Sequence, residues 1–262
     1  MQSTEHSNYE NSFRDSLATI SETGKRLWVY AKQPKGKFYN LRTLFAGFLL
    51  AFFFGMPFIK YNGESFLLLN FLDRKFILFG TTFWPQDSYV LALMMLSVFV
   101  FLILFTVVYG RIWCGWICPQ TIFLEHLFRR VEYWIEGTHI QQKKLNEGPW
   151  NFNKTWRKIL KYSVFMALSF LIISTLSSYL IGIDALLNNY TLSFAEKPGF
   201  FSATIGFTLA FYFVYTWFRE QVCTLVCPYG RLQGVILDAD SILVSYDYKR
   251  GEPRGRSEKE GD

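Results

Sequence analysis

Four stretches of the sequence run for roughly the thickness of a bilayer without a charged side chain. They cover residues 43–59, 88–110, 162–183 and 198–218. A helix needs about 20 mostly apolar residues to cross the hydrocarbon core, so these runs predict four transmembrane helices. A long, largely polar segment precedes the first run, unlike the start of a cleaved signal peptide. The predicted fold class is therefore an all-α membrane protein.

The segments around the four runs divide the chain into three predicted parts. Residues 1–40 form an N-terminal segment outside the membrane, 41–240 a four-span membrane domain, and 241–262 a flexible linker rich in Arg, Gly, Pro and Glu. The apolar stretch 66–85 is interrupted by charges at 73–75. It is too short to cross, and we expect it to lie at the far interface or to re-enter the membrane.

Apolar residues recur at helical spacing in residues 119–137, which predicts an amphipathic cytoplasmic helix. One side of this helix carries Phe123, Leu127, Val131 and Trp134, and Arg130, Glu132 and Glu136 lie more to the other. Such a helix is suited to lie on the membrane surface or to cover a site there.

Basic residues fall almost entirely on one side of the predicted membrane. The segment before the first span, the segment 111–161 and the tail from 219 carry 7, 9 and 7 of the 27 Lys and Arg residues, and the other two loops carry 4. Loops rich in Lys and Arg stay in the cytoplasm, so we expect both termini of the chain there. The net charge of +6 then indicates contact with anionic lipid rather than nucleic acid.

Composition excludes two other classes of protein. Aromatic residues make up 19% of the chain and charged residues only 18%, against about 25% charged in soluble domains. A disordered chain contains few apolar side chains and many charged ones, which is the opposite balance. Four cysteines in 262 residues are too few for a small secreted domain stabilised by disulfides.

All four cysteines fall in two copies of the pattern Cys-x-x-x-Cys-Pro. Cys114 and Cys118 follow the second predicted span, and Cys223 and Cys227 follow the fourth. The chain thus repeats a transmembrane hairpin followed by a cysteine motif and a short cytoplasmic helix. Internal repeats in membrane proteins often place the functional site between the repeats. The four thiols are therefore expected to converge on the cytoplasmic side.

The proline after each motif predicts the geometry of the cysteine before it. A residue before proline avoids the α region, so Cys118 and Cys227 are expected at the N-caps of helices that begin at the proline. The positive end of each helix, together with Arg111 or Arg219 just upstream of each motif, is expected to lower the thiol pKa. Four thiolates suit an iron–sulfur cluster or Zn(II), and fewer suit Cu(I).

Other interpretations of the cysteines remain open. Cysteine also packs as a small buried apolar residue, and a disulfide is disfavoured in a reducing cytosol. His126, eight residues after Cys118, is a weaker candidate for a further ligand. The sequence contains no phosphate-binding glycine loop, catalytic Ser/His/Asp set or zinc-protease helix motif.

Four motifs, in the same order, resemble the cytochrome c oxidase accessory protein family (CcoG/FixG/RdxA type). They are RKFILFGTTFWPQD at 74–87, CGWICPQT at 114–121, REQVC at 219–223 with CPY at 227–229, and VSYD at 244–247 with RGEPRG at 250–255. More distantly, the paired Cys-Pro motifs resemble membrane ferredoxins of the quinol-dehydrogenase kind. The resemblance covers most of the chain and corresponds to the N-terminal membrane part of the family.

The resemblance implies a multi-pass protein of the bacterial cytoplasmic membrane that helps to assemble the cbb3-type oxidase by reducing Cu(II) to Cu(I). It also implies two [4Fe-4S] clusters in a cytoplasmic ferredoxin domain. The chain ends at Asp262, about where the first ferredoxin cysteine of the family would follow. We therefore expect that domain and its cluster ligands to be absent from this chain. The implied partners are the oxidase assembly machinery and copper transport proteins, and a homo-oligomer remains open.

The leading hypothesis is a membrane redox or metal protein, such as a cupric reductase, that handles copper for oxidase assembly. Its metal ligands, binding copper or an iron–sulfur cluster, are Cys114, Cys118, Cys223 and Cys227, with Arg111 and Arg219 as electrostatic support. The alternatives are a quinol-to-ferredoxin electron-transfer subunit without copper, a thiol–disulfide oxidoreductase, and a scaffold that docks onto the oxidase. The thiol–disulfide alternative requires cysteines on the outer face, which the distribution of basic residues disfavours.

Overall fold

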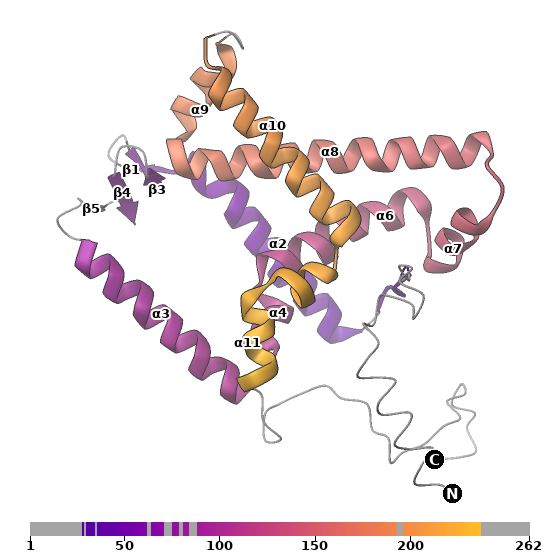
Figure 1. The fold of residues 1–262 in the computed structure, drawn as a ribbon, viewed down its shortest axis with the longest axis horizontal. Helices are drawn as coiled ribbons and strands as arrows, with labels where there is room; N and C mark the ends of the chain where they lie inside the picture. Colours follow the sequence, from indigo (N-terminus) through magenta and orange to yellow (C-terminus); the bar gives the residue numbers. More distant parts are fainter. Residues whose placement is uncertain are drawn as a thin grey trace, which may run out of the picture.

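The computed structural model describes residues 28, 30–34, 36–61, 64–70, 75–78, 81–83, 88–192 and 196–236. The predicted linker 241–262 and most of the predicted N-terminal segment lie outside the described residues. Within the part that is described, helices predominate, and several long helices determine the shape (Figure 1).

In the part of the chain that the structure describes, four helices are long and apolar enough to cross a membrane, which matches the number predicted from the sequence. They are α2 (Lys37–Gly55) with the 3-10 turn Met56–Phe58, α3 (Ser88–Tyr109), α8 (Phe152–Ile181), and α10 (Pro198–Phe213) with the π-helical turn Val214–Phe218. The buried share of their apolar windows is only 6% in α3 and 28% in α8. Apolar side chains exposed to this extent require lipid around them, so these helices form a membrane domain.

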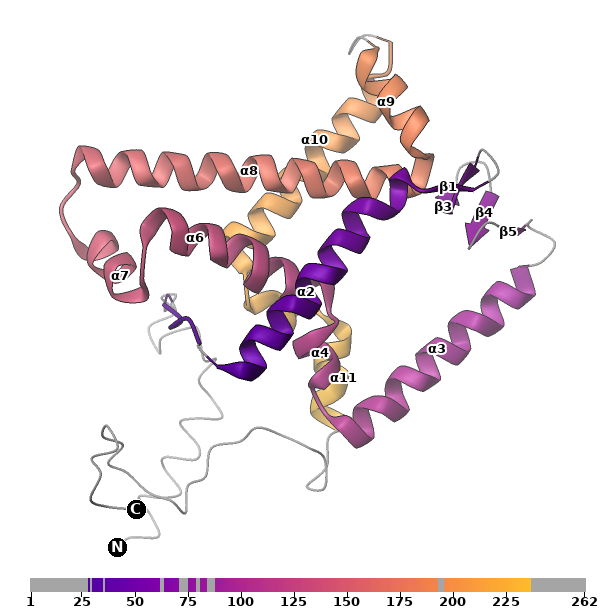
Figure 2. The same cartoon turned by 180° about the vertical axis from the view of Figure 1, so that it is seen from behind.

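The spans do not form a closed bundle in either view (Figures 1 and 2). α10 crosses α8 and packs against it. The end of α2 reaches α8, where the Tyr179 hydroxyl donates a hydrogen bond of 2.7 Å to the Phe53 carbonyl. α3 stands apart from α2, α8 and α10 along its length and contacts α4 (Ile112–Trp116) and α11 (Pro228–Ile236) at its C-terminal end.

The two halves of the chain differ where the sequence predicts a repeat. Between α2 and α3 the chain forms strands, whereas between α8 and α10 it forms helix α9 (Ile183–Thr191). α8 packs directly against α10, while α2 and α3 stand apart. The predicted layout of two equivalent hairpins is therefore not confirmed.

The strands after α2 are the part of the fold that an all-α prediction misses. They are β1 (Lys60–Tyr61), β2 (Glu64–Ser65), β3 (Leu67–Asn70), β4 (Lys75–Leu78) and β5 (Thr81–Phe83). β1 pairs with β2, and β3, β4 and β5 form an antiparallel sheet in which Leu68 lies opposite Ile77. Both of these side chains are buried, and β3 lies against α8. Apolar runs too short to cross as helices satisfy their backbone groups by pairing instead.

The predicted amphipathic helix is present, and two charged residues from its polar side are buried. It consists of α5 (Pro119–Ile122), the π-helical turn Phe123–Phe128 and α6 (Arg129–Glu136), and it ends at Gly137 with φ 85°. Glu132 and Glu136 are buried, while Trp134 is 84% exposed. The amphipathic pattern alone does not account for the burial of these two glutamates, which has two causes. The wider π turn changes the angular position of the residues that follow it, and basic partners on α8 compensate both charges.

A lysine at the start of α8 explains why this helix begins ten residues before its apolar run. α7 (His139–Glu147) precedes α8 and begins with a capping box formed by Thr138 and Gln141. Lys154 donates hydrogen bonds to the carbonyls of Asn146 (3.0 Å) and Gly148 (2.7 Å). The first turns of α8 thereby bind the C-terminal end of α7, where a cation is favourable.

An aromatic core joins the amphipathic helix to two of the spans. Phe128 stacks on Tyr215 of the π turn that follows α10, at 4.5 Å between ring centroids. It also meets Phe165 of α8 edge-on at 5.0 Å. Phe128, Phe165 and Tyr215 are all almost completely buried, and Phe123, Leu124 and Ile172 extend the same cluster. This packing holds the segment after the first cysteine motif against the spans.

We expect Phe165→Ala to lower the free energy of unfolding by about 3–5 kcal/mol, because it leaves a cavity beneath Phe128. The change should appear in the unfolding midpoint of the detergent-solubilised chain. Phe170→Ala, at a position on α8 that is 46% exposed, is the control and should have a much smaller effect. Equal effects of the two substitutions would contradict a core at Phe165.

Candidate metal centre

Each cysteine pair combines one cysteine inside a helical turn with one at the start of a helix. Cys114 lies in α4, and Cys223 in the π-helical turn Val222–Val226. Cys118 is the N-cap of α5 with φ −57° and ψ 122°, and Cys227 has φ −69° and ψ 113° directly before α11. The extended conformation before proline is the one predicted from the sequence.

The four thiols come together at the junction of α4, α5 and α11. All four are free thiols of intermediate burial. Cys114 interacts electrostatically with Cys118 and Cys227, and Cys223 interacts with the three others. α11 is held closely against this junction, because a Cβ atom at Gly230 would lie 2.3 Å from the Cys223 carbonyl oxygen. These interactions favour the predicted convergence of the two motifs, while a shared metal site at the four cysteines remains a prediction.

The pKa values of two thiols move opposite to the sequence prediction. Burial raises the pKa of Cys223 to about 11, and the neighbouring thiols add to this effect. Burial also raises the pKa of Cys114, although a hydrogen bond from Gln233 and the charge of Arg111 act in the other direction. Loss of hydration therefore outweighs nearby positive charge at these two sulfurs. Thiols in this environment become thiolates when a metal replaces the proton.

The two arginines upstream of the motifs have different surroundings. Arg111 is exposed, and its charge acts on Cys114. Arg219 is 5% exposed, donates a hydrogen bond of 2.6 Å to Glu132, and lies 5.0 Å from the Trp28 ring centroid. Its backbone has a positive φ of 49°, which no other non-glycine residue among those described has. Arg219 thus shapes the chain before the second motif and pairs with a carboxylate, while the electrostatic support predicted from it remains a prediction.

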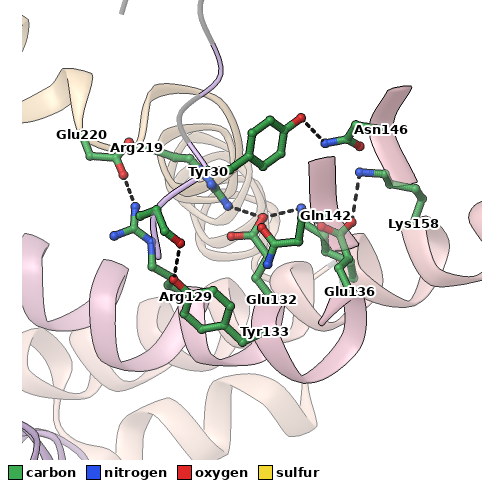
Figure 3. Close-up of polar contacts among 12 residues, drawn as sticks. Tyr30, Arg129, Glu132, Tyr133, Glu136, Gln142, Asn146, Lys158, Arg219 and Glu220 are labelled. Carbon is green, nitrogen blue, oxygen red and sulfur yellow. Dashed lines mark hydrogen bonds and ion pairs between the residues drawn. The ribbon is translucent and has the colours of Figure 1, made fainter. Parts of the chain in front are cut away.

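Buried ion pairs beside the cysteines link α6, α8 and the second motif (Figure 3). Glu132 pairs with Arg219 and Lys161, and Glu136 pairs with Lys161 and Lys158, both at 3.0 Å. Burial raises the pKa of Glu132, but the charges of Arg219 and Lys161 outweigh it and lower the pKa below its usual value. We refer to these five residues, Glu132, Glu136, Lys158, Lys161 and Arg219, as the charge network. The network remains buried because every charge in it has a partner of opposite sign.

Further polar contacts surround the charge network (Figure 3). Arg129 pairs with both Glu125 and Glu220, which joins α6 to the segment before Cys223. The Tyr133 hydroxyl donates to the Ala31 carbonyl at 2.8 Å, and the Asn146 amide donates to the Tyr30 hydroxyl at 2.5 Å. Sequence reasoning suggested that Glu125 and Glu220 pair with Arg129 or Arg219, and both pair with Arg129. It missed the ion pairs that Glu132 and Glu136 form with lysines of α8. The spacing of Lys154, Arg157, Lys158 and Lys161 along one helix was a signal for these pairs, because it predicts a row of positive charge.

His126 is not placed with the cysteines as a further ligand. It is 7% exposed, and its ring stacks on Tyr39 at 6.2 Å between centroids. Neither ring nitrogen has a hydrogen-bond partner among the described residues. Burial lowers the pKa of His126 to about 4, with Arg42 and Arg130 adding to the effect. The neutral imidazole therefore belongs to the packing between α2 and the amphipathic helix.

The four thiols are the type of ligand that an iron–sulfur cluster uses. Within the described ranges, no group of three or more His, Cys, Asp or Glu residues is placed to hold one ion. A cubane of iron and sulfide holds its thiolate ligands farther apart than one ion does, because its own atoms separate them. Four half-buried thiols with a glutamine N–H on one sulfur have the donor chemistry of a cysteine-ligated iron–sulfur cluster.

We expect Glu132→Gln to destabilise the chain by about 3–5 kcal/mol, because it leaves Lys161 and Arg219 buried with too little negative charge. Unfolding of the solubilised protein measures this change. The control is Glu147→Gln, which removes an ion pair with Lys143. The Glu147 side chain is 67% exposed, so this substitution should lower the free energy of unfolding by less than about 1 kcal/mol. A wild-type midpoint for Glu132→Gln would show that the network contributes no stability.

In the metal-free chain, we expect alkylation of Cys223 to keep accelerating as the pH rises from 9 towards 11. The reason is that the raised pKa keeps this thiol protonated at neutral pH, and the thiolate is the nucleophile. Site-resolved mass spectrometry after short iodoacetamide pulses gives the rate. A rate that levels off below pH 9 would contradict the effect of burial.

Two family models match the chain, one at each cysteine motif. The model described as "4Fe-4S binding domain" matches residues 91–138, and the model described as "4Fe-4S dicluster domain" matches residues 218–262. We expected the chain to lack the cysteine ligands of the family's clusters. The second match does not support that expectation. No solved structure matches the chain.

Curated relatives match most of the chain. It is 32% identical to Protein RdxA of Cereibacter sphaeroides over 239 residues and 31% identical to the nitrogen fixation protein FixG of Rhizobium meliloti over 241 residues. Protein RdxB of Cereibacter sphaeroides is 30% identical over 247 residues. These alignments cover 89–92% of the chain, which spans about half the length of each relative (45–51%). With 4Fe-4S domains and four apolar helices, the chain belongs to the FixG/RdxA family and is a membrane iron–sulfur protein.

Proposed function

We propose that the chain is an electron-transfer protein in which Cys114, Cys118, Cys223 and Cys227 hold one [4Fe-4S] cluster at the membrane surface. The observation that carries the proposal is the meeting of two motifs separated by more than a hundred residues. Each motif lies within a separate 4Fe-4S family match. One shared cluster accounts for both observations with the cysteines that the chain contains.

The surroundings of the thiols support this role. A bound cluster would supply one-electron transfer without forming or breaking a bond to carbon. Partial burial of the four sulfurs lowers the local dielectric and limits access of water. The charge network and the Gly230 contact keep the two motifs in place, which limits structural reorganisation when the electron moves.

For the electron acceptor we propose Cu(II), which takes one electron to become Cu(I). In this proposal the chain lies in the bacterial inner membrane with both termini in the cytoplasm, in accord with the distribution of Lys and Arg. Its proposed partners are copper transport proteins and the machinery that assembles a cbb3-type oxidase.

A second candidate is electron transfer between quinol and ferredoxin-type clusters without copper. The match of the "4Fe-4S dicluster domain" model to residues 218–262 favours it, because a domain with two clusters is suited to carry electrons onward. In this alternative the cysteine centre is the entry point for electrons from the membrane.

We expect the wild-type chain, reconstituted with iron and sulfide without oxygen, to contain about four iron and four sulfide per chain, as one cubane requires. A variant with all four cysteines changed to serine should contain almost none, because its ligands are missing. Thr224→Ser, inside the second motif, is the matched control and should keep the full content. Metal and sulfide analysis with electron paramagnetic resonance provides the measurement. Equal iron in the four-serine variant would overturn the proposal.

The same preparation distinguishes the two acceptors. If Cu(II) is the substrate, the reduced chain is reoxidised by Cu(II), and a Cu(I)-specific dye detects the product. If the chain instead accepts electrons from quinol, quinol should reduce the iron–sulfur cluster even when a chelator removes copper. A reduced chain that Cu(II) fails to reoxidise would exclude the copper role.

A further inference from the structure

Gln233 forms a direct contact between the two halves of the chain at the sulfur centre. Its side-chain amide Nε2 donates a hydrogen bond of 3.3 Å to the Sγ atom of Cys114. Gln233 lies on α11 in the second half, and Cys114 lies on α4 in the first half. Gln233 is 2% exposed, so water does not compete for its amide.

The helix that carries Gln233 is held by two contacts in its first turn. The Tyr229 hydroxyl, one turn before Gln233, forms a hydrogen bond with Thr106 near the end of α3. Gly230 allows α11 to approach the Cys223 carbonyl closely. The amide of Gln233 therefore comes from a fixed helix, and its N–H stays directed at the sulfur.

A hydrogen bond to a ligand sulfur has a definite electrostatic consequence. When a cluster accepts an electron, part of the added charge is carried by its sulfur ligands. An N–H donor stabilises that charge more in the reduced state than in the oxidised state, and the reduction potential becomes more positive. The effect needs no bond to be made or broken, only one electron more on the cluster.

We propose that Gln233 is a positioning residue whose amide raises the reduction potential of a cluster bound at Cys114. The inference rests on the proposed function, because it requires a cluster at the four cysteines. It assigns a role to a residue outside the cysteine motifs that sequence analysis did not single out. It also explains why a polar glutamine is buried beside Cys114, although a leucine of similar size could fill the same space.

The test compares the reduction potentials of three variants in the full-length chain reconstituted with iron and sulfide. Gln233→Leu removes the donor, and Gln233→Glu keeps the shape but replaces the donor with an oxygen. The control is Gln142→Leu, which removes a buried glutamine whose amide donates to the Gly137 carbonyl at 3.0 Å and not to a cysteine. Potentials are measured by redox titration with electron paramagnetic resonance detection, and iron and sulfide are counted in each sample.

We expect Gln233→Leu to retain its iron and sulfide and to titrate at a more negative potential than wild type. Gln233→Glu should shift further in the same direction, and Gln142→Leu should titrate with wild type. An unchanged potential in a fully loaded Gln233→Leu sample would overturn the inference and leave the proposed function intact. Loss of iron from both Gln233 variants would also overturn it, since the residue would then be needed for assembly. A wild-type chain without a cluster would instead refute the proposed function, and this inference with it.

Discussion

The arrangement of the cysteines depends on a buried pairing of charges beside them. Glu132, on the helix that follows the first motif, pairs with Arg219, which stands just before the second motif, and with Lys161 of α8. A buried charge without a partner would destabilise the fold strongly, so each charged group in the network fixes the position of its partners. The network therefore sets the distance between two segments that are remote in the sequence. Arg219 also has a positive φ of 49°, a conformation that the surrounding structure must stabilise.

Burial and local electrostatics compete at the thiols, and burial prevails at two of them. A cysteine close to helix ends and an arginine is expected to ionise readily. Here the sulfurs of Cys114 and Cys223 are removed from water to a degree that raises their pKa. Metal-free thiols of this kind stay protonated at neutral pH, whereas a metal stabilises the thiolate directly. The same surroundings thus disfavour reactive free thiols and suit permanent metal ligands.

The site occupies the junction of the helical elements that leave the membrane. α4 follows α3, α11 follows the π turns after α10, and the aromatic core around Phe128 fixes the amphipathic helix between them. Electron transfer requires such a centre to be rigid on one side and accessible on the other. The rigid side is formed by the charge network, and the half-exposed cysteines provide the accessible side.

The sequence alone determined the four spans, because charge-free runs of bilayer length have few other uses in a folded chain. It also determined the conformation of Cys118 and Cys227, since the following proline acts locally on the backbone. The buried face of 119–136 and the strands after α2 were not determined by local pattern. A π turn and distant lysines decided that Glu132 and Glu136 face inward, and these are contacts between remote segments. The thiol pKa values and the Gln233 contact were likewise decided by tertiary structure, because burial depends on what packs around a residue and not on its neighbours in sequence.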